Sequence, residues 1–129
     1  MKTKDIGALG EKIAAKYLKS NKYKIVARNL HISRNELDII AVKKRSGIIA
    51  FVEVKTRSVD EDMYSKFGTP SSSVTKAKQE RTITATRAYL AQSKKFKALQ
   101  PRLDVIEIYL QRDNKKLLNI NHIENAFGV

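Results

Sequence analysis

Two runs rich in β-branched and apolar residues, 37–42 (LDIIAV) and 48–56 (IIAFVEVKT), are joined by a short segment that ends in Gly47. Runs of this composition are typical of strands, and a short linker containing glycine is typical of a hairpin. Successive side chains of a strand point to opposite faces, and both faces of these runs are apolar. The chain is therefore restricted to folds in which these two strands are central and covered.

The turn fixes the register of this hairpin. A turn centred on residues 45–46 pairs Lys43 with Ile48, and counting outward then pairs Asp38 with Glu53. Directly opposed residues have Cβ atoms about 4.5–5.5 Å apart, where like charges repel each other. At the end of an apolar core, such a pair needs a shared proton, a cationic partner or a divalent metal ion.

Lys55 lies two residues beyond Glu53, on the same face, and so supplies a cation beside the pair. Carboxylates without His or Cys nearby favour Mg²⁺ or Mn²⁺ over zinc. We expect the ion to be held by Asp38, Glu53 and Glu11, with Lys55 orienting a water or stabilising charge on phosphorus during phosphodiester hydrolysis. The residues alone leave two alternatives open: the cluster is a structural ion-pair network, and Glu11 is an exposed residue on a helix flank.

Hydrophobic periodicity predicts the remaining regular elements. Apolar residues recur at helical spacing over 6–19 and 74–92, which indicates two amphipathic helices. Alternating patterns predict strands over 23–30 and 103–110, and an edge strand over 117–120. The order α, β, β, β, α, β requires a crossover before the strand at 103–110, and hence a mixed sheet flanked by helices.

The connecting segments have less pattern. Residues 58–73 lack periodicity and contain glycine, proline and serines, so we expect a surface loop there. A helical turn is expected near 122–127. The 129 residues suit a single α/β domain spanning 1–129.

The charge of the chain points to a polyanionic partner. Twenty-six Lys and Arg residues against 13 Asp and Glu residues give a formal net charge of +13. Such an excess is the electrostatic pattern of a surface that binds nucleic acid. Lys12, on the polar side of the first helix, and Arg57, just beyond Lys55, are candidates for these contacts.

The sequence contains no cysteine, which excludes disulfides and thiolate metal sites. Its longest purely apolar run, 48–52, is much shorter than a membrane span, and the first residues lack the pattern of a signal peptide. We therefore expect a cytoplasmic protein without membrane contact.

The segment 36–57, ELDIIAVKKRSGIIAFVEVKTR, resembles the core motif of the PD-(D/E)XK nuclease superfamily, with Asp38 as the first acid and 53–55 as the E-x-K element. The whole chain is similar to the YraN-like family, described as predicted endonucleases distantly related to archaeal Holliday junction resolvases. The pieces that carry this second resemblance are G-x-x-G-E-x-x-A-x-x-Y-L at 7–18, Asn29, E-L-D-I-I, F-V-E-V-K-T-R, 67–70, Lys76 with Gln79, 102–105 and 125–127.

The resemblance implies a restriction-endonuclease-like αβββαβ core with Asp38, Glu53 and Glu11 as metal ligands. It also implies that Lys76 and Gln79, on the second helix, lie near the mouth of the site and contact phosphate. A homodimer is expected by the same analogy, because resolvase-like nucleases that cut two strands commonly pair.

Two functions of different classes follow from these patterns. The first is a Mg²⁺- or Mn²⁺-dependent endonuclease that cuts DNA, including branched or otherwise structured DNA. The second is a non-catalytic module that binds DNA or RNA through the same basic surface. Retention of Asp38, Glu53 and Lys55 favours the nuclease, because paired acids repel phosphate and offer little to a pure binder.

Overall fold

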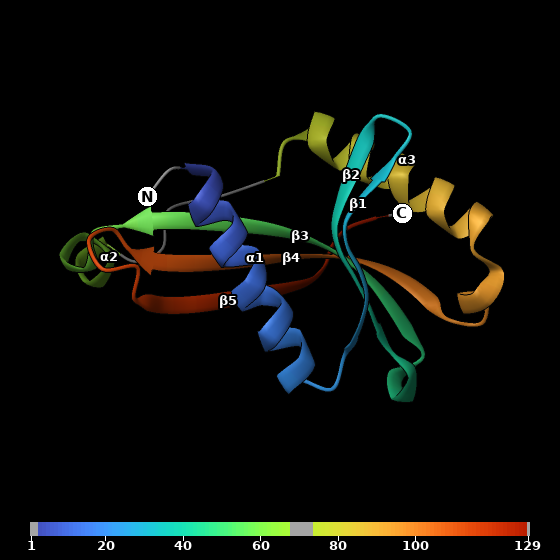
Figure 1. The fold of residues 1–129 in the computed structure, drawn as a ribbon, viewed down its shortest axis with the longest axis horizontal. Helices are drawn as coiled ribbons and strands as arrows, with labels where there is room; N and C mark the ends of the chain where they lie inside the picture. The colour runs from blue at the N-terminus through green and yellow to red at the C-terminus, as the bar shows by residue number, and fades with distance from the viewer. Residues whose placement is uncertain (1–2, 68–73, 129) are drawn as a thin grey trace.

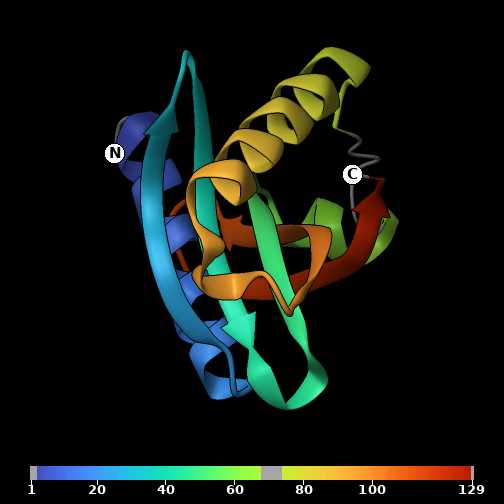
Figure 2. The same ribbon diagram turned by 90° about the vertical axis from the view of Figure 1, so that its right-hand side faces the viewer.

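The computed structural model describes residues 3–67 and 74–128, in which one five-stranded sheet is covered by helices (Figures 1 and 2). The elements in chain order are α1 (Thr3–Ser20), β1 (Lys24–Ile32), β2 (Asn35–Lys43), the 3₁₀ turn η1 (Lys44–Ser46), β3 (Ile48–Val59), α2 (Glu61–Phe67), α3 (Lys76–Gln92), the 3₁₀ turn η2 (Lys94–Phe96), β4 (Gln100–Gln111) and β5 (Leu117–Phe127).

The sheet is mixed and has the strand order β1-β2-β3-β4-β5. Neighbouring strands are antiparallel except β3 and β4, which are parallel and are connected through α3. A parallel pair needs such a crossover, and here a helix provides it. The α/β architecture and the mixed sheet flanked by helices are confirmed, and both are consistent with a restriction-endonuclease-like fold.

The hairpin formed by β2 and β3 has the predicted register over its paired length. Lys43 lies opposite Ile48, and the pairing continues up to Ile39 opposite Val52. Beyond that point the two strands separate. β2 continues as a two-stranded ribbon with β1, whereas β3 continues beside β4 as far as Val59 (Figure 1). The sheet therefore forks directly after the Ile39–Val52 pair, where Asp38 and Glu53 follow on the two strands.

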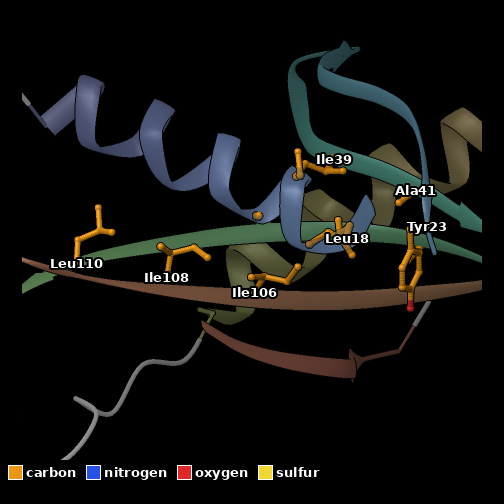
Figure 3. Close-up of a cluster of buried hydrophobic side chains, with 11 residues drawn as sticks. Leu18, Tyr23, Ile39, Ala41, Ile106, Ile108 and Leu110 are labelled. Atoms are coloured by element: carbon orange, nitrogen blue, oxygen red, sulfur yellow. The ribbon is translucent and has the colours of Figure 1, made fainter. Parts of the chain in front are cut away.

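Each face of the sheet carries its own apolar core. Helix α1 covers one face, where Leu18 packs among Ile39, Ile106 and Ile108, all of them fully buried (Figure 3). Helix α3 covers the other face through Ala85, and the buried side chains there include Ile40, Val42, Ile49, Phe51 and Leu103. These two layers explain why both faces of β2 and β3 are apolar.

The prediction of a loop over 58–73 is wrong for the part that the structure describes. β3 continues to Val59, and α2 follows it; residues 68–73 lie outside the described part. Asp60 begins the helix, since its Oδ1 accepts hydrogen bonds from the N–H groups of Asp62 (2.9 Å) and Met63 (3.4 Å). Tyr64 then packs on the ring of Tyr109, with centroids 5.6 Å apart. Asp60 and the two acidic residues that follow it thus begin a helix and are not part of a loop.

The helical turn expected near 122–127 is also wrong. These residues belong to β5, which pairs with β4 from Leu110–Leu117 to Leu103–Phe127, with two irregularities. Pairing along a neighbouring strand satisfies the backbone better than an isolated turn would. Within the described ranges, none of the helices is both long enough and apolar enough to pass through a bilayer.

Candidate functional site

Asp38 and Glu53 lie where β2 and β3 separate. The backbone N–H of Val54 donates a 2.9 Å hydrogen bond to Asp38 Oδ2, so a side chain satisfies a donor that no longer has a partner strand. Leu37 and Ile39, which strict alternation would place on one face, pack in different cores, although both keep a regular pairing with β1. Glu53 is 6% exposed.

The two carboxyls interact strongly. Burial and, to a smaller extent, the negative charge of Glu53 raise the pKa of Asp38 to about 7, although the Val54 hydrogen bond and Lys78 oppose the shift. A hydrogen bond between the two carboxyl groups also contributes, and it requires a proton on one of them. Without a bound cation, Asp38 therefore holds its proton up to about pH 7.

The cation beside this pair comes from α3. Lys78 Nζ lies 3.2 Å from Glu53 Oε1. Helix α3 is capped by Thr75, whose hydroxyl accepts from the Lys78 N–H, and its buried side chains are Thr82, Ala85 and Thr86. Lys78 lies one turn before Thr82, so it extends the buried stripe of the helix toward the carboxylates.

Glu11 reaches the site because α1 packs closely on β3. A Cβ atom at Gly10 would lie 2.8 Å from Thr56 Cβ and closer still to its hydroxyl, so only glycine permits this approach. Burial raises the pKa of Glu11 and Asp38 raises it further, while Arg28, whose Nε lies 3.5 Å from Glu11 Oε1, lowers it. That same oxygen is buried and has no hydrogen bond.

Glu11, Asp38 and Glu53 line one cavity of about 320 Å³. The cavity combines three carboxylates from three elements with one lysine, and two of the carboxylates have raised pKa values. Hard oxygen ligands that carry excess negative charge are those that Mg²⁺ and Mn²⁺ prefer. The donor set therefore fits a divalent ion of this class. The full lining is Ile6, Gly7, Glu11, Asp38, Glu53, Val54, Thr56 and Lys78.

The other β3 candidates lie outside this lining. Lys55 is half-buried and lies beside Glu107 of β4 in the parallel register. Arg57 follows on the same strand, beside Tyr109. The cation next to Glu53 is instead Lys78, which sequence reasoning missed.

The candidates on the helices lie around the site. Lys12 is exposed on α1 and Lys76 is exposed at the start of α3. Gln79 is half-buried, and its side-chain amide donates to the Val74 carbonyl at 2.9 Å. The structure thus brings the three acids together and places the candidate phosphate contacts on neighbouring helix surface.

A second polar cluster lies on the α1 face, centred on Asp104, which is completely buried. Arg102 donates to both Asp104 oxygens at 2.8 Å, and His122 Nε2 lies 2.8 Å from Oδ2. Tyr17 forms a 3.1 Å hydrogen bond with His122 Nδ1. Burial alone would raise the pKa of Asp104, but the hydrogen bonds from His122 and Arg102 outweigh it, and the pKa lies below its usual range.

This second cluster also has the donor atoms for a metal ion. Asp104, His122 and Glu124 offer one ligand atom each, all within 4.8 Å of one another. However, the Arg102 guanidinium lies between the acids, 2.8 Å from Asp104 and 3.1 Å from Glu124. A resident cation already neutralises these carboxylates, so the set fits a divalent ion less well than the cavity at Asp38.

Comparisons with known proteins agree on one family. The model of the uncharacterised protein family UPF0102 matches residues 10–108. A UPF0102 protein of Caldanaerobacter subterraneus subsp. tengcongensis is 44% identical over 124 residues, which are 96% of this chain and 95% of that protein. A UPF0102 protein of Clostridium perfringens is 41% identical over 126 residues, 98% and 96% of the two chains. One of Chlorobium phaeobacteroides is 39% identical over 125 residues, 95% and 92% of the two chains.

Proposed function

We propose that this chain, which belongs to the uncharacterised protein family UPF0102, is a divalent-metal-dependent endonuclease that hydrolyses phosphodiester bonds in DNA. The observation that carries the proposal is the cavity at the fork of the sheet. There Asp38 keeps a proton to about pH 7 beside the nearly buried Glu53, an arrangement that a bound divalent ion would relieve. The net charge of +13 supports a polyanionic substrate.

Asp38, Glu53 and Glu11 would hold the ion, which is Mg²⁺ or Mn²⁺ by the chemistry of its ligands. When bound, such an ion supplies Lewis-acid stabilisation of the phosphate and lowers the pKa of a water molecule in the site. Asp38 must lose its proton to act as a ligand, and Lys78 favours that loss. Lys78 is also the nearest ammonium group able to stabilise negative charge on the phosphate.

The surrounding basic residues would position the nucleic acid. Lys12 and Lys76 are exposed on the helices that approach the cavity, and Lys55 and Arg57 follow Glu53 on β3. Phosphate contacts of this kind fix the register of a duplex without reading its sequence. A cytoplasmic location and a homodimer that cuts both strands are part of the same proposal.

The test is a cleavage assay on linear, flapped and four-way DNA with Mg²⁺ or Mn²⁺, or with EDTA. Asp38→Asn and Glu53→Gln preserve side-chain shape and should lower the rate by about 10²-fold or more. The matched control is Glu80→Gln, an exposed glutamate on α3, which should cleave like the unaltered protein.

Two results would contradict the proposal. Cleavage that persists in both site variants would come from a contaminant or from another site. If the unaltered chain never cleaves and both variants bind DNA more tightly, the chain is a binding module whose acids only oppose phosphate.

A further inference from the structure

The end of α1 and the turn of the β2–β3 hairpin lie at the same end of the sheet (Figures 1 and 2). Residues of both line a groove of about 820 Å³. Of the described residues that line it, none is acidic and most are cations. We call it the basic groove and define it by Lys22, Lys24, Lys43, Lys44 and Arg45. Like charges so close together repel one another, so the groove favours an anionic occupant.

The backbone at Lys22 adds an independent observation. Lys22 has a φ of 72°, in the left-handed region that favours glycine. Its N–H bonds to the Lys19 carbonyl at 3.1 Å, and the Tyr23 N–H bonds to the Leu18 carbonyl at 3.0 Å. This is the hydrogen-bond pattern of a glycine-type helix end, yet the position holds a lysine that lines the groove. The left-handed backbone does not itself require a lysine, and the side chain at this position adds one more cation to the groove.

The separation between the basic groove and the candidate active site can be estimated along two elements, β2 and α1, and the two estimates are similar. Along β2, the five residue steps from Asp38 to Lys43 span roughly 17 Å. Along α1, the nine helical steps from Glu11 to Ser20 span roughly 14 Å, and the turn residues Asn21 and Lys22 follow. The exposed lysines on the polar side of α1 between the two ends are Lys12, Lys16 and Lys19.

We propose that the basic groove binds the phosphate backbone of duplex DNA about five base pairs from the bond that is cut, with the lysine row of α1 between the two. The spacing follows from a rise of about 3.4 Å per base pair over the 17 Å separation. This inference deepens the proposed nuclease function and rests on it for the position of the cut. The substrate is then a duplex arm that extends at least this far from the cleavage point.

The test measures binding without cleavage, by fluorescence anisotropy of a labelled 20-base-pair duplex in EDTA at several salt concentrations. The groove variant is Lys44→Gln with Arg45→Gln, both exposed in η1. The matched control is Arg112→Gln with Lys116→Gln, which removes the same two charges from the exposed turn at the other end of β3. The groove variant should bind roughly tenfold more weakly and lower the slope of log Kd against log salt by about 2, while the control should change little.

A second variant separates binding from folding. Lys22→Gly relieves the left-handed backbone and should raise the melting temperature, yet it should weaken DNA binding and lower the salt slope by about 1. A variant that merely damaged the fold would lower both stability and binding.

Equal loss of affinity in the groove variant and its control would overturn the inference, and so would a groove variant that binds like the unaltered protein. Either result can occur while metal-dependent cleavage is observed, and the nuclease proposal then stands without the groove. Selective loss of binding in a chain that never cleaves would retain the groove as a duplex-binding site and reject the nuclease.

Discussion

The Val54 backbone N–H donates a hydrogen bond to the carboxylate of Asp38 across the point where their strands separate. A backbone donor in a sheet normally bonds to the neighbouring strand. Here the donor has lost that partner because β2 turns away with β1, and the acid takes its place. The same divergence opens a cavity between two otherwise packed strands, so the geometry that exposes the site also fixes one of its acids.

The stability of the metal-free protein should fall as pH rises from about 4 to 7. Asp38 has its folded pKa raised from 3.8 to about 7, so the folded state holds a proton that the unfolded chain has already lost. One pKa unit corresponds to about 1.4 kcal/mol, and even half of the shift gives about 2 kcal/mol. Urea denaturation in EDTA at pH 5 and pH 8 measures this difference.

Asp38→Asn should remove most of that pH dependence and make the protein more stable at pH 8. Asp113→Asn, at an exposed turn, serves as the control and should keep the dependence of the unaltered protein. If Asp38→Asn and the control show the same slope, the proton does not reside at the fork.

Lys78→Met should slow cleavage at pH 7 by about tenfold or more and move the pH dependence of the rate upward. The reason is that Lys78 lowers the pKa of Asp38, so loss of Lys78 makes Asp38 harder to deprotonate. Rate against pH is the measurement, and Lys78→Arg should retain much of the activity. Lys76→Met removes an exposed charge from the same helix turn and should leave the pH midpoint in place. A midpoint that Lys78→Met does not move would exclude this role.

Gly10→Ala should destabilise the protein by roughly 1–3 kcal/mol, because the added methyl group overlaps the side chain of Thr56. Gly7→Ala provides the matched control on the same helix. It has open space around it and should instead stabilise by up to about 1 kcal/mol through helix propensity. Urea denaturation of both variants decides the matter, and changes of the same sign would mean that α1 does not rest on β3 as described.

Arg102→Met should destabilise the fold by about 3–5 kcal/mol, since it leaves the fully buried Asp104 carboxylate without its main counter-ion. Asp104 has a lowered pKa, so its contribution is present above its unfolded pKa and is lost as pH falls through the folded value. The variant should lose stability at a higher pH than the unaltered protein. Arg112→Met, at an exposed turn, should change stability by less than about 0.5 kcal/mol. Similar losses in the two variants would contradict this account.

The fold was predictable where one local feature fixes the geometry. The turn at 45–46 determines the register, so pairing from Lys43–Ile48 to Ile39–Val52 follows by counting. The start of α2 was missed because Asp60 acts through capping rather than through hydrophobic periodicity. The strand at 122–127 was missed because its conformation depends on β4, a neighbour that local patterns do not reveal.

Counting outward from the turn predicts that Asp38 and Glu53 lie close together, and they do so one step beyond the last ladder pair, in the cavity that Glu11 also lines. The residues alone left the position of Glu11 open. Lys78 was not predicted because the buried stripe of α3 consists of Thr82, Ala85 and Thr86, small or polar residues that hydrophobic periodicity does not mark. Lys78 lies on the same side of the helix as this stripe, one turn before Thr82 and two turns before Ala85. His122 was similarly missed, since its partners Asp104 and Tyr17 lie on other elements.

The fork in the sheet divides the three carboxylates that line the cavity among separately anchored segments. Asp38 belongs to the β1–β2 ribbon, Glu53 to the strand that continues with β4, and Glu11 to the helix above them. A divalent ion held by all three carboxylates would therefore tie these segments together and stabilise the folded state. The melting temperature should then climb with the logarithm of the free ion concentration, by an amount set by its dissociation constant.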